Sequence, residues 1–125
     1  DLIFSMNQEI FSVDNKLKFN GRIENFDAFG DRTIFAKVIP NKKWNVLRDK
    51  TLDAVLKLAP DCTKKDKRPF QPHLTVANRD IPLGVSVQAL EVMNELNLIE
   101  DFPVDNITIF ERRENKWCIA WSGEL

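Results

Sequence analysis

Apolar residues recur along the chain with two different periods, and each period predicts a different kind of element. Apolar positions three and four residues apart predict amphipathic helices, whereas strict alternation predicts strands with one buried face. By this criterion, helices are expected at residues 1–13, 42–58 and 86–96, with Ser86 as the N-cap of the last. Strands are expected at residues 16–26, 33–39, around His73, 104–112 and 116–122.

The segments between these elements have the composition of turns. Residues 27–31 combine Asp and Gly, Asn20-Gly21 marks a bulge or turn inside the first strand, and residues 113–115 are polar and short enough for a hairpin. Pro40 and Pro60 flank the second helix. The order is helix, two strands, helix, strand, helix and hairpin, which predicts an α+β fold with a largely antiparallel sheet.

Composition narrows the class of protein. A chain of 125 residues with 43% hydrophobic and 30% charged residues is expected to form a single domain, residues 1–125, with a sizeable core. Its net charge of −1 argues against a broad basic surface for duplex nucleic acid. Cys62 and Cys118 lack metal-type spacing, which favours reduced thiols in a cytoplasmic protein. No apolar run approaches the roughly 20 residues of a membrane span, so no membrane association is expected.

The candidate chemistry lies in residues 68–77, which read RPFQPHLTVA and contain the only histidine of the chain, His73. Because side chains alternate along a strand, His73 and Thr75 share one face, and Leu74 and Val76 are expected to point into a core. A base beside a hydroxyl could hold and protonate a phosphate. The alternative is a structural histidine, hydrogen-bonded within an aromatic-flanked strand.

Several neighbouring residues have two possible roles. Arg79 would share the face of Thr75 if the strand continues, and could neutralise phosphate charge; otherwise it is a solvated residue at the strand end. Phe70 could support a base-stacking surface or pack in the core. A basic loop could steer RNA toward the site or simply be solvated; it contains Lys64, Lys65, Lys67 and Arg68. The tryptophans at 44, 117 and 121 are assigned to packing.

Residues 70–79, FQPHLTVANR, resemble the second His-x-Thr motif of the 2H phosphoesterases, the superfamily of 2′-5′ RNA ligase-like proteins and RNA cyclic phosphodiesterases. Residues 26–38 are similar to the central hairpin of that family, residues 44–58 to the helix before the motif, and residues 107–117 to the final strands. The resemblance implies a two-lobed fold with largely antiparallel sheets flanked by helices. This chain would be its C-terminal two-thirds, without the N-terminal strands.

The resemblance also implies a function. It indicates a metal-independent phosphoesterase, without a cofactor, acting on 2′,3′-cyclic or 2′-5′-linked nucleotides or RNA ends. His73 would be one of two acid/base histidines and Thr75 a phosphate ligand, with Arg79 and Phe70 binding substrate. Two imidazoles are needed because one takes a proton from the attacking water while the other protonates the leaving oxygen.

The other histidine is absent from these residues and is expected upstream of Asp1. Two alternatives remain open. One is a catalytically inactive member of the same fold that binds nucleotides or RNA. The other is an unrelated α+β interaction domain, in which the motif would be a coincidence.

Overall fold

The computed structural model describes residues 17–61 and 68–125, which form parts of two compact units. The first unit comprises Asp1–Phe19, Lys42–Arg68 and Pro103–Leu125, and the second comprises Asn20–Asn41 and Pro69–Phe102. The helix expected at residues 1–13 lies outside the described residues. So do Cys62 and most of the basic loop, namely Lys64, Lys65 and Lys67.

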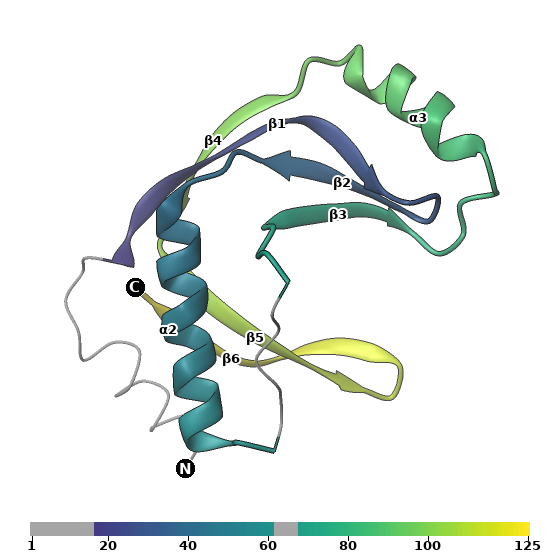
Figure 1. Cartoon of the computed structure of the whole chain (residues 1–125). Helices are drawn as coiled ribbons and strands as arrows, with labels where there is room; N and C mark the ends of the chain where they lie inside the picture. The colour runs from purple at the N-terminus through teal and green to yellow at the C-terminus, as the bar shows by residue number, and fades with distance from the viewer. Residues whose placement is uncertain (1–16, 62–67) are drawn as a thin grey trace. The chain divides into compact units, whose positions relative to one another are not determined.

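A curled sheet dominates the second unit and confirms the expected α+β class (Figure 1). Its strands, in the spatial order β3-β2-β1-β4, are β1 (Phe19–Phe29), β2 (Thr33–Val38), β3 (His73–Asn78) and β4 (Ile99–Val104). β2 pairs antiparallel with both β1 and β3. The sequence did not predict β4, because its residues IEDFPV do not alternate. At the edge of the sheet in the described residues, this strand tolerates Pro103, which has no N–H to donate.

The centre of the sheet is β2, where three consecutive residues are buried. Ile34, Phe35 and Ala36 are 3%, 1% and 2% exposed. Their side chains alternate between the faces, so β2 is covered on both sides as well as hydrogen-bonded along both edges. The strand predicted at residues 33–39 is therefore confirmed to within one residue.

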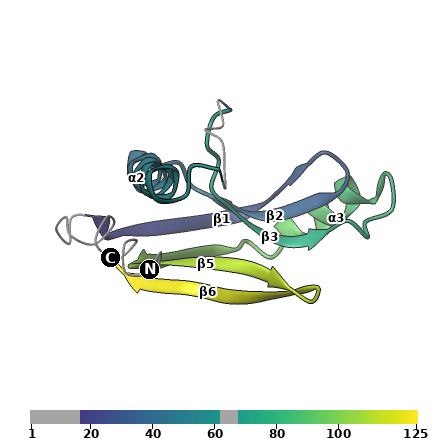
Figure 2. The ribbon, with the colours of Figure 1, turned by 90° about the horizontal axis from the view of Figure 1, so that it is seen from below.

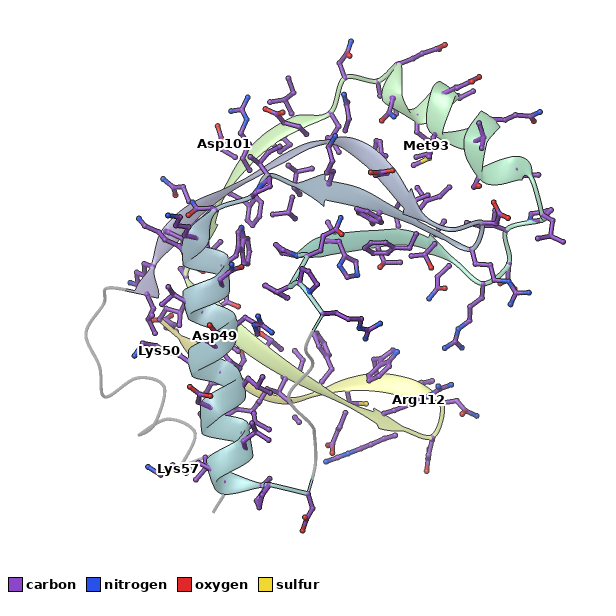
Figure 3. All side chains as sticks on the ribbon, viewed as in Figure 1. Asp49, Lys50, Lys57, Met93, Asp101 and Arg112 are labelled. Atoms are coloured by element: carbon purple, nitrogen blue, oxygen red, sulfur yellow. The ribbon has the colours of Figure 1, made fainter. Side chains whose placement is uncertain are left out.

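A bulge interrupts β1 in its middle and is completed by a helix side chain. The register with β2 shifts between Ile23 and Phe26, and Asn25 has a φ of 56°. Asn94, the last residue of α3 (Val85–Asn94), accepts a hydrogen bond from the Phe26 N–H at 2.8 Å and donates one to the Phe26 carbonyl at 3.3 Å. The neighbouring Met93 points from α3 toward the sheet (Figure 3). The helix thus supplies hydrogen bonds to the backbone at the bulge.

Helix α3 begins differently from the prediction. Its N-cap is Gly84, with a φ of 80°, and no side chain caps it. Ser86 lies inside the helix with only 2% of its surface exposed, and its hydroxyl is 3.4 Å from an Asp31 carboxylate oxygen. The prediction of a Ser86 cap is wrong because α3 begins at Val85, before Ser86, and the Ser86 hydroxyl contacts Asp31, which is distant in sequence.

An ion-pair cluster joins β1 to β4. The Arg22 guanidinium donates to Glu24 at 2.8 Å and to Asp101 of β4 at 3.2 Å. The pKa of Arg22 is raised above its usual value, first by the hydrogen bond to Glu24 and then by the attraction of Asp101. Because the group is solvent-exposed, the cluster favours this strand order without adding much stability.

The first unit contains α2 (Lys42–Leu58) and a hairpin of β5 (Asn106–Arg113) and β6 (Lys116–Glu124), which run side by side (Figure 2). The helix has the bounds that the sequence predicts. Glu114 and Asn115 form the turn with φ of 48° and 64°, the positive values of a type I′ hairpin. Buried apolar residues of this unit are Leu17, Phe19, Leu47, Ala54, Val104, Trp121 and Leu125. Within the described residues, no helix is long and apolar enough to cross a membrane.

The three tryptophans do not share the packing role that the sequence predicts. Trp44 packs edge-on against Phe19 at 4.9 Å between ring centroids, and Trp121 is 6% exposed. Trp117, in contrast, is 69% exposed. The prediction is wrong for Trp117 because the β5–β6 register shifts between Ile109 and Phe110. The extra residue in β6 breaks the alternation that would have placed Trp117 and Trp121 on one face.

Gly21 provides a test of the close approach between β1 and β4. A Cβ at Gly21 would lie 2.6 Å from Cζ of Phe102, which is closer than van der Waals contact allows. Gly21→Ala should therefore lower the free energy of unfolding by about 1–3 kcal/mol, although Gly-to-Ala changes in strands are otherwise neutral or stabilising. Urea denaturation measures this. In a Phe102→Leu background, which lacks Cζ, the cost should shrink; an undiminished cost would contradict this packing.

Candidate active site

His73 and Thr75 lie on the same face of β3, as alternation predicts. His73 is opposite Lys37 in the register with β2, Thr75 is opposite Phe35, and no shift intervenes between these two pairs. Both side chains are exposed to solvent. Leu74 and Val76, which were expected in a core, are 56% and 49% exposed. That expectation is wrong because, in the described part of the chain, the burial of this face does not extend from β2 to the edge strand β3: Ala36, the register partner of Leu74, is 2% exposed.

Two phenylalanines hold the imidazole of His73 on this face. The His73 ring lies 5.0 Å from Phe29 at an interplanar angle of 89° and 5.4 Å from Phe35 at 65°. Phe29 and Phe35 stack on each other at 4.2 Å. Because Phe35 is almost fully buried, the imidazole is packed directly against the core of the sheet.

A backbone contact fixes the tautomer of the imidazole. His73 Nδ1 is 2.8 Å from the Gln71 carbonyl oxygen. A carbonyl only accepts hydrogen bonds, so Nδ1 carries the proton and donates it. In the neutral ring Nε2 is then the unprotonated nitrogen, which is able to accept a proton. The side chain is thus oriented at one nitrogen and available for proton transfer at the other.

The Thr75 hydroxyl is available to a ligand. Among the described residues, the structure records no hydrogen-bond partner for it. A hydroxyl is both donor and acceptor, and its hydrogen rotates to suit its partner. The face of β3 therefore presents an oriented imidazole and a rotatable hydroxyl two residues apart.

Arg79 and Phe70 are less clearly part of this face. β3 ends at Asn78, and Arg79 follows with a φ of 68° and its N–H bonded to the Arg32 carbonyl at 3.0 Å. The strand continuation that would align Arg79 with Thr75 is thus absent. Phe70 is 38% exposed and precedes β3 by three residues. Substrate binding by either residue stays a prediction.

Sequence reasoning missed Lys37. This exposed lysine is the register partner of His73 and so lies on the same face as the imidazole. The sequence does contain a signal, a charged residue at the polar end of an apolar strand. Only the pairing of β2 with β3, more than thirty residues away in sequence, associates that charge with His73.

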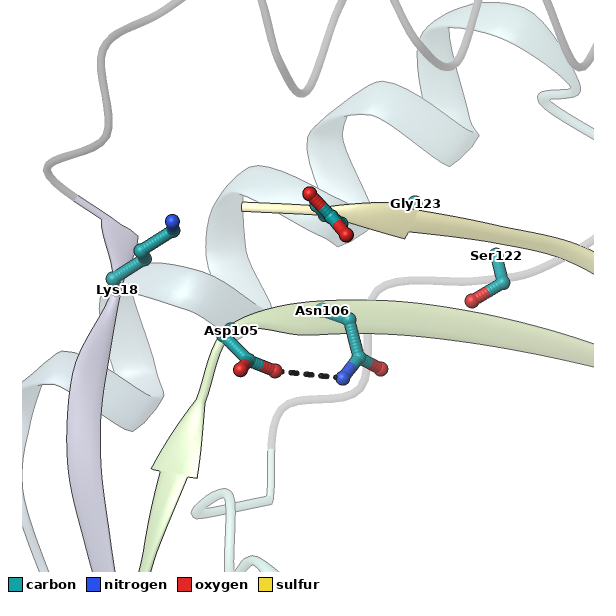
Figure 4. A pocket seen from close by; sticks show the side chains of 6 residues that line it. Lys18, Asp105, Asn106, Ser122 and Gly123 are labelled. Atoms are coloured by element: carbon teal, nitrogen blue, oxygen red, sulfur yellow. Dashed lines mark hydrogen bonds between the residues drawn. The ribbon is translucent and has the colours of Figure 1, made fainter.

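A separate hollow lies in the first unit and contains none of the predicted site residues (Figure 4). Its volume is about 520 Å³, and it is lined by Lys18, Asp105, Asn106, Ser122, Gly123 and Glu124. The Asn106 amide donates to Asp105 at 2.8 Å. Across the described residues, no three His, Cys, Asp or Glu side chains gather as a metal site would require. The hollow is shallow and mixed in charge, and we assign it no role.

Comparison with known families identifies the family of the chain. A family profile described as the 2′-5′ RNA ligase superfamily matches residues 7–116, which is most of the chain. The chain therefore belongs to the 2′-5′ RNA ligase superfamily, and the resemblance to 2H phosphoesterases is confirmed. Proteins of this superfamily act on phosphodiester bonds of RNA or nucleotides. Among curated proteins, none matches the sequence significantly.

The histidine geometry has a direct spectroscopic test. Because the chain has one histidine, ¹⁵N–¹H correlation spectra should show a single imidazole. In its neutral form, the ring should be the Nδ1–H tautomer, owing to the Gln71 carbonyl. Free histidine in water supplies the reference spectrum. A dominant Nε2–H tautomer would contradict the hydrogen bond and the free Nε2 that follows from it.

Proposed function

We propose that this protein is a metal-independent phosphoesterase that opens 2′,3′-cyclic or cleaves 2′-5′-linked phosphodiesters in nucleotides or at RNA ends. The observation that carries the proposal is the oriented imidazole of His73 beside the free hydroxyl of Thr75 on an exposed strand face. Membership of the 2′-5′ RNA ligase superfamily supports the substrate class. No cofactor takes part in the proposed reaction.

The proposed reaction is a hydrolysis with two proton transfers. Water attacks phosphorus and loses a proton to a base, while the bond from phosphorus to one ribose oxygen breaks and that oxygen receives a proton from an acid. The product of ring opening is a phosphomonoester. His73 is one of the two groups, acting through Nε2, since Nδ1 is occupied by the Gln71 carbonyl.

Two further side chains of the face fit the phosphate itself. The Thr75 hydroxyl would donate to a non-bridging oxygen and fix the phosphate beside the imidazole. Lys37, opposite His73 in the register, would offset the negative charge that develops on those oxygens. This arrangement gives the face one proton-transfer group, one hydrogen-bond donor and one cation.

The second proton-transfer group is not a histidine of these 125 residues, because His73 is the only one. We propose that it is a second imidazole from a segment outside the sequence described. Assays therefore use the protein with its natural flanking sequence. The same observation favours a second candidate function, a catalytically inactive protein that binds nucleotides or RNA ends through the same face.

Substitution of His73 and Thr75 separates these two functions. His73→Ala should lower kcat/KM for a 2′,3′-cyclic nucleotide by on the order of 10²–10⁴-fold, because a general acid or base is lost. Thr75→Val keeps the shape and the strand propensity but removes the donor, and should cost about 10-fold to 100-fold. Rates are measured from phosphomonoester formation. If wild type and His73→Ala are equally inactive yet bind the nucleotide, the binding function replaces the enzymatic one.

Lys37 is tested against a lysine elsewhere on the surface. Lys37→Gln should weaken turnover of the cyclic substrate by about tenfold, because a charge-assisted contact to phosphate is lost. Lys50→Gln on α2 removes the same charge from another exposed position and is the matched control. Equal effects of the two variants would reduce the role of Lys37 to general electrostatic attraction.

A further inference from the structure

One face of the β5–β6 hairpin exposes large apolar side chains. In the register, Phe110 is opposite Ile119 and Arg112 is opposite Trp117, and paired residues lie on the same side of a sheet. Phe110, Ile119 and Trp117 are 55%, 64% and 69% exposed. We call the surface formed by these four residues the hairpin face.

The hairpin already buries its other face. Ile109 and Trp121 are register partners on that opposite side, and Trp121 is 6% exposed. The hairpin is thus anchored by one face, while its other face exposes apolar side chains. Contiguous exposed aromatic residues of this kind mark binding surfaces more often than isolated ones do.

The charge of the hairpin face favours an anion. Glu111 and Arg113, the neighbours of Arg112 in sequence, project to the opposite side and form an ion pair with each other. Arg112 is therefore the ionisable side chain that this face carries, and it lies near the turn end of the hairpin (Figure 3). Farther along the same face, the Thr108 and Ser122 hydroxyls are 3.0 Å apart. The four residues of the hairpin face include no carboxylate, and Glu124, opposite Asn106, lies on the same side beyond Ser122.

Aromatic rings beside a cation match the chemistry of single-stranded nucleic acid. Bases stack on aromatic side chains with little dependence on sequence, and the phosphates between them are bound by arginine. A lipid surface would favour several cations around the apolar residues, and this face has one. In a duplex the bases are paired and stacked on one another, so they would not be available to stack on Trp117 and Phe110.

We propose that the hairpin face binds single-stranded RNA, with Trp117 and Phe110 stacking on bases and Arg112 contacting a phosphate. The proposal rests on the proposed function and names single-stranded RNA, rather than a free mononucleotide, as the ligand of this surface. The hairpin face and His73 belong to different units, so their contributions are separable by measurement.

The first test is binding of a fluorescein-labelled oligouridylate, followed by anisotropy. Trp117→Ala should weaken binding by about 5-fold to 150-fold, the range for loss of one stacked base, whereas Trp117→Phe should retain most of the affinity. Leu83→Ala, at an 81% exposed apolar position in the other unit, is the matched control and should have no effect. Circular dichroism verifies that each variant is folded.

The second test uses salt dependence. Arg112→Gln should lower the slope of log Kd against log salt by about 0.7, the value for one phosphate contact on a single strand. Arg113→Gln removes the same charge one residue away, from a guanidinium that Glu111 already engages, and should leave the slope unchanged. Equal slopes for both variants would show that Arg112 does not contact a phosphate.

Two results would overturn the proposal. One is an unchanged affinity of Trp117→Ala for the oligouridylate. The other is a dimer in sedimentation experiments that Trp117→Ala dissociates, since the hairpin face would then be an interface between copies of the chain. Failure of the proposed function gives a different result: His73→Ala would keep wild-type turnover, whatever happens to RNA binding. In support, His73→Ala should bind the oligouridylate as tightly as wild type while losing hydrolysis.

Discussion

The burial of Phe35 in the central strand is the contact on which the candidate site depends. Its ring is 1% exposed, stacks on Phe29 at 4.2 Å and meets the imidazole of His73 edge-on at 5.4 Å. The apolar driving force that forms the sheet therefore also positions the candidate proton-transfer group. Because His73 starts an edge strand, it gains this rigid support while its ring remains open to solvent. Rigid support of an exposed group is what an oriented acid or base needs.

The imidazole is held from two directions by different forces. Packing against Phe29 and Phe35 fixes where the ring lies, and the hydrogen bond from Nδ1 to the Gln71 carbonyl fixes which nitrogen is free. Neither contact uses a charged group, so the orientation should be insensitive to salt. The contacts to phosphate proposed for Thr75 and Lys37 are then the polar part of the site, added to a face whose geometry is set by apolar residues.

The hairpin of the first unit shows how one extra residue changes which side chains of a strand are buried. The alternation of Trp117, Ile119 and Trp121 indicates one shared face, and a regular strand would have buried all three. The register shift beside Ile109 places Trp121 in the core and leaves Trp117 and Ile119 on the surface. A similar shift in β3, between Thr75 and Ala77, falls after the His-x-Thr pair and leaves its shared face intact.

Local sequence determined the bounds of α2 and β2, the antiparallel α+β class, the shared face of His73 and Thr75 and the membership of the superfamily, because each depends on side-chain period or on a short motif. Tertiary structure decided the rest. The residues of β4 do not alternate, and this strand is formed through its pairing with β1. The N-cap of α3 is Gly84, and the Ser86 hydroxyl contacts Asp31 instead of capping the helix. Strand register places Lys37 opposite His73 and places Trp117 on the exposed face of its hairpin. The register shifts between Ile34 and Phe35 and between Ile109 and Phe110 arise from pairing between separate segments, so the alternation within one segment does not reveal them.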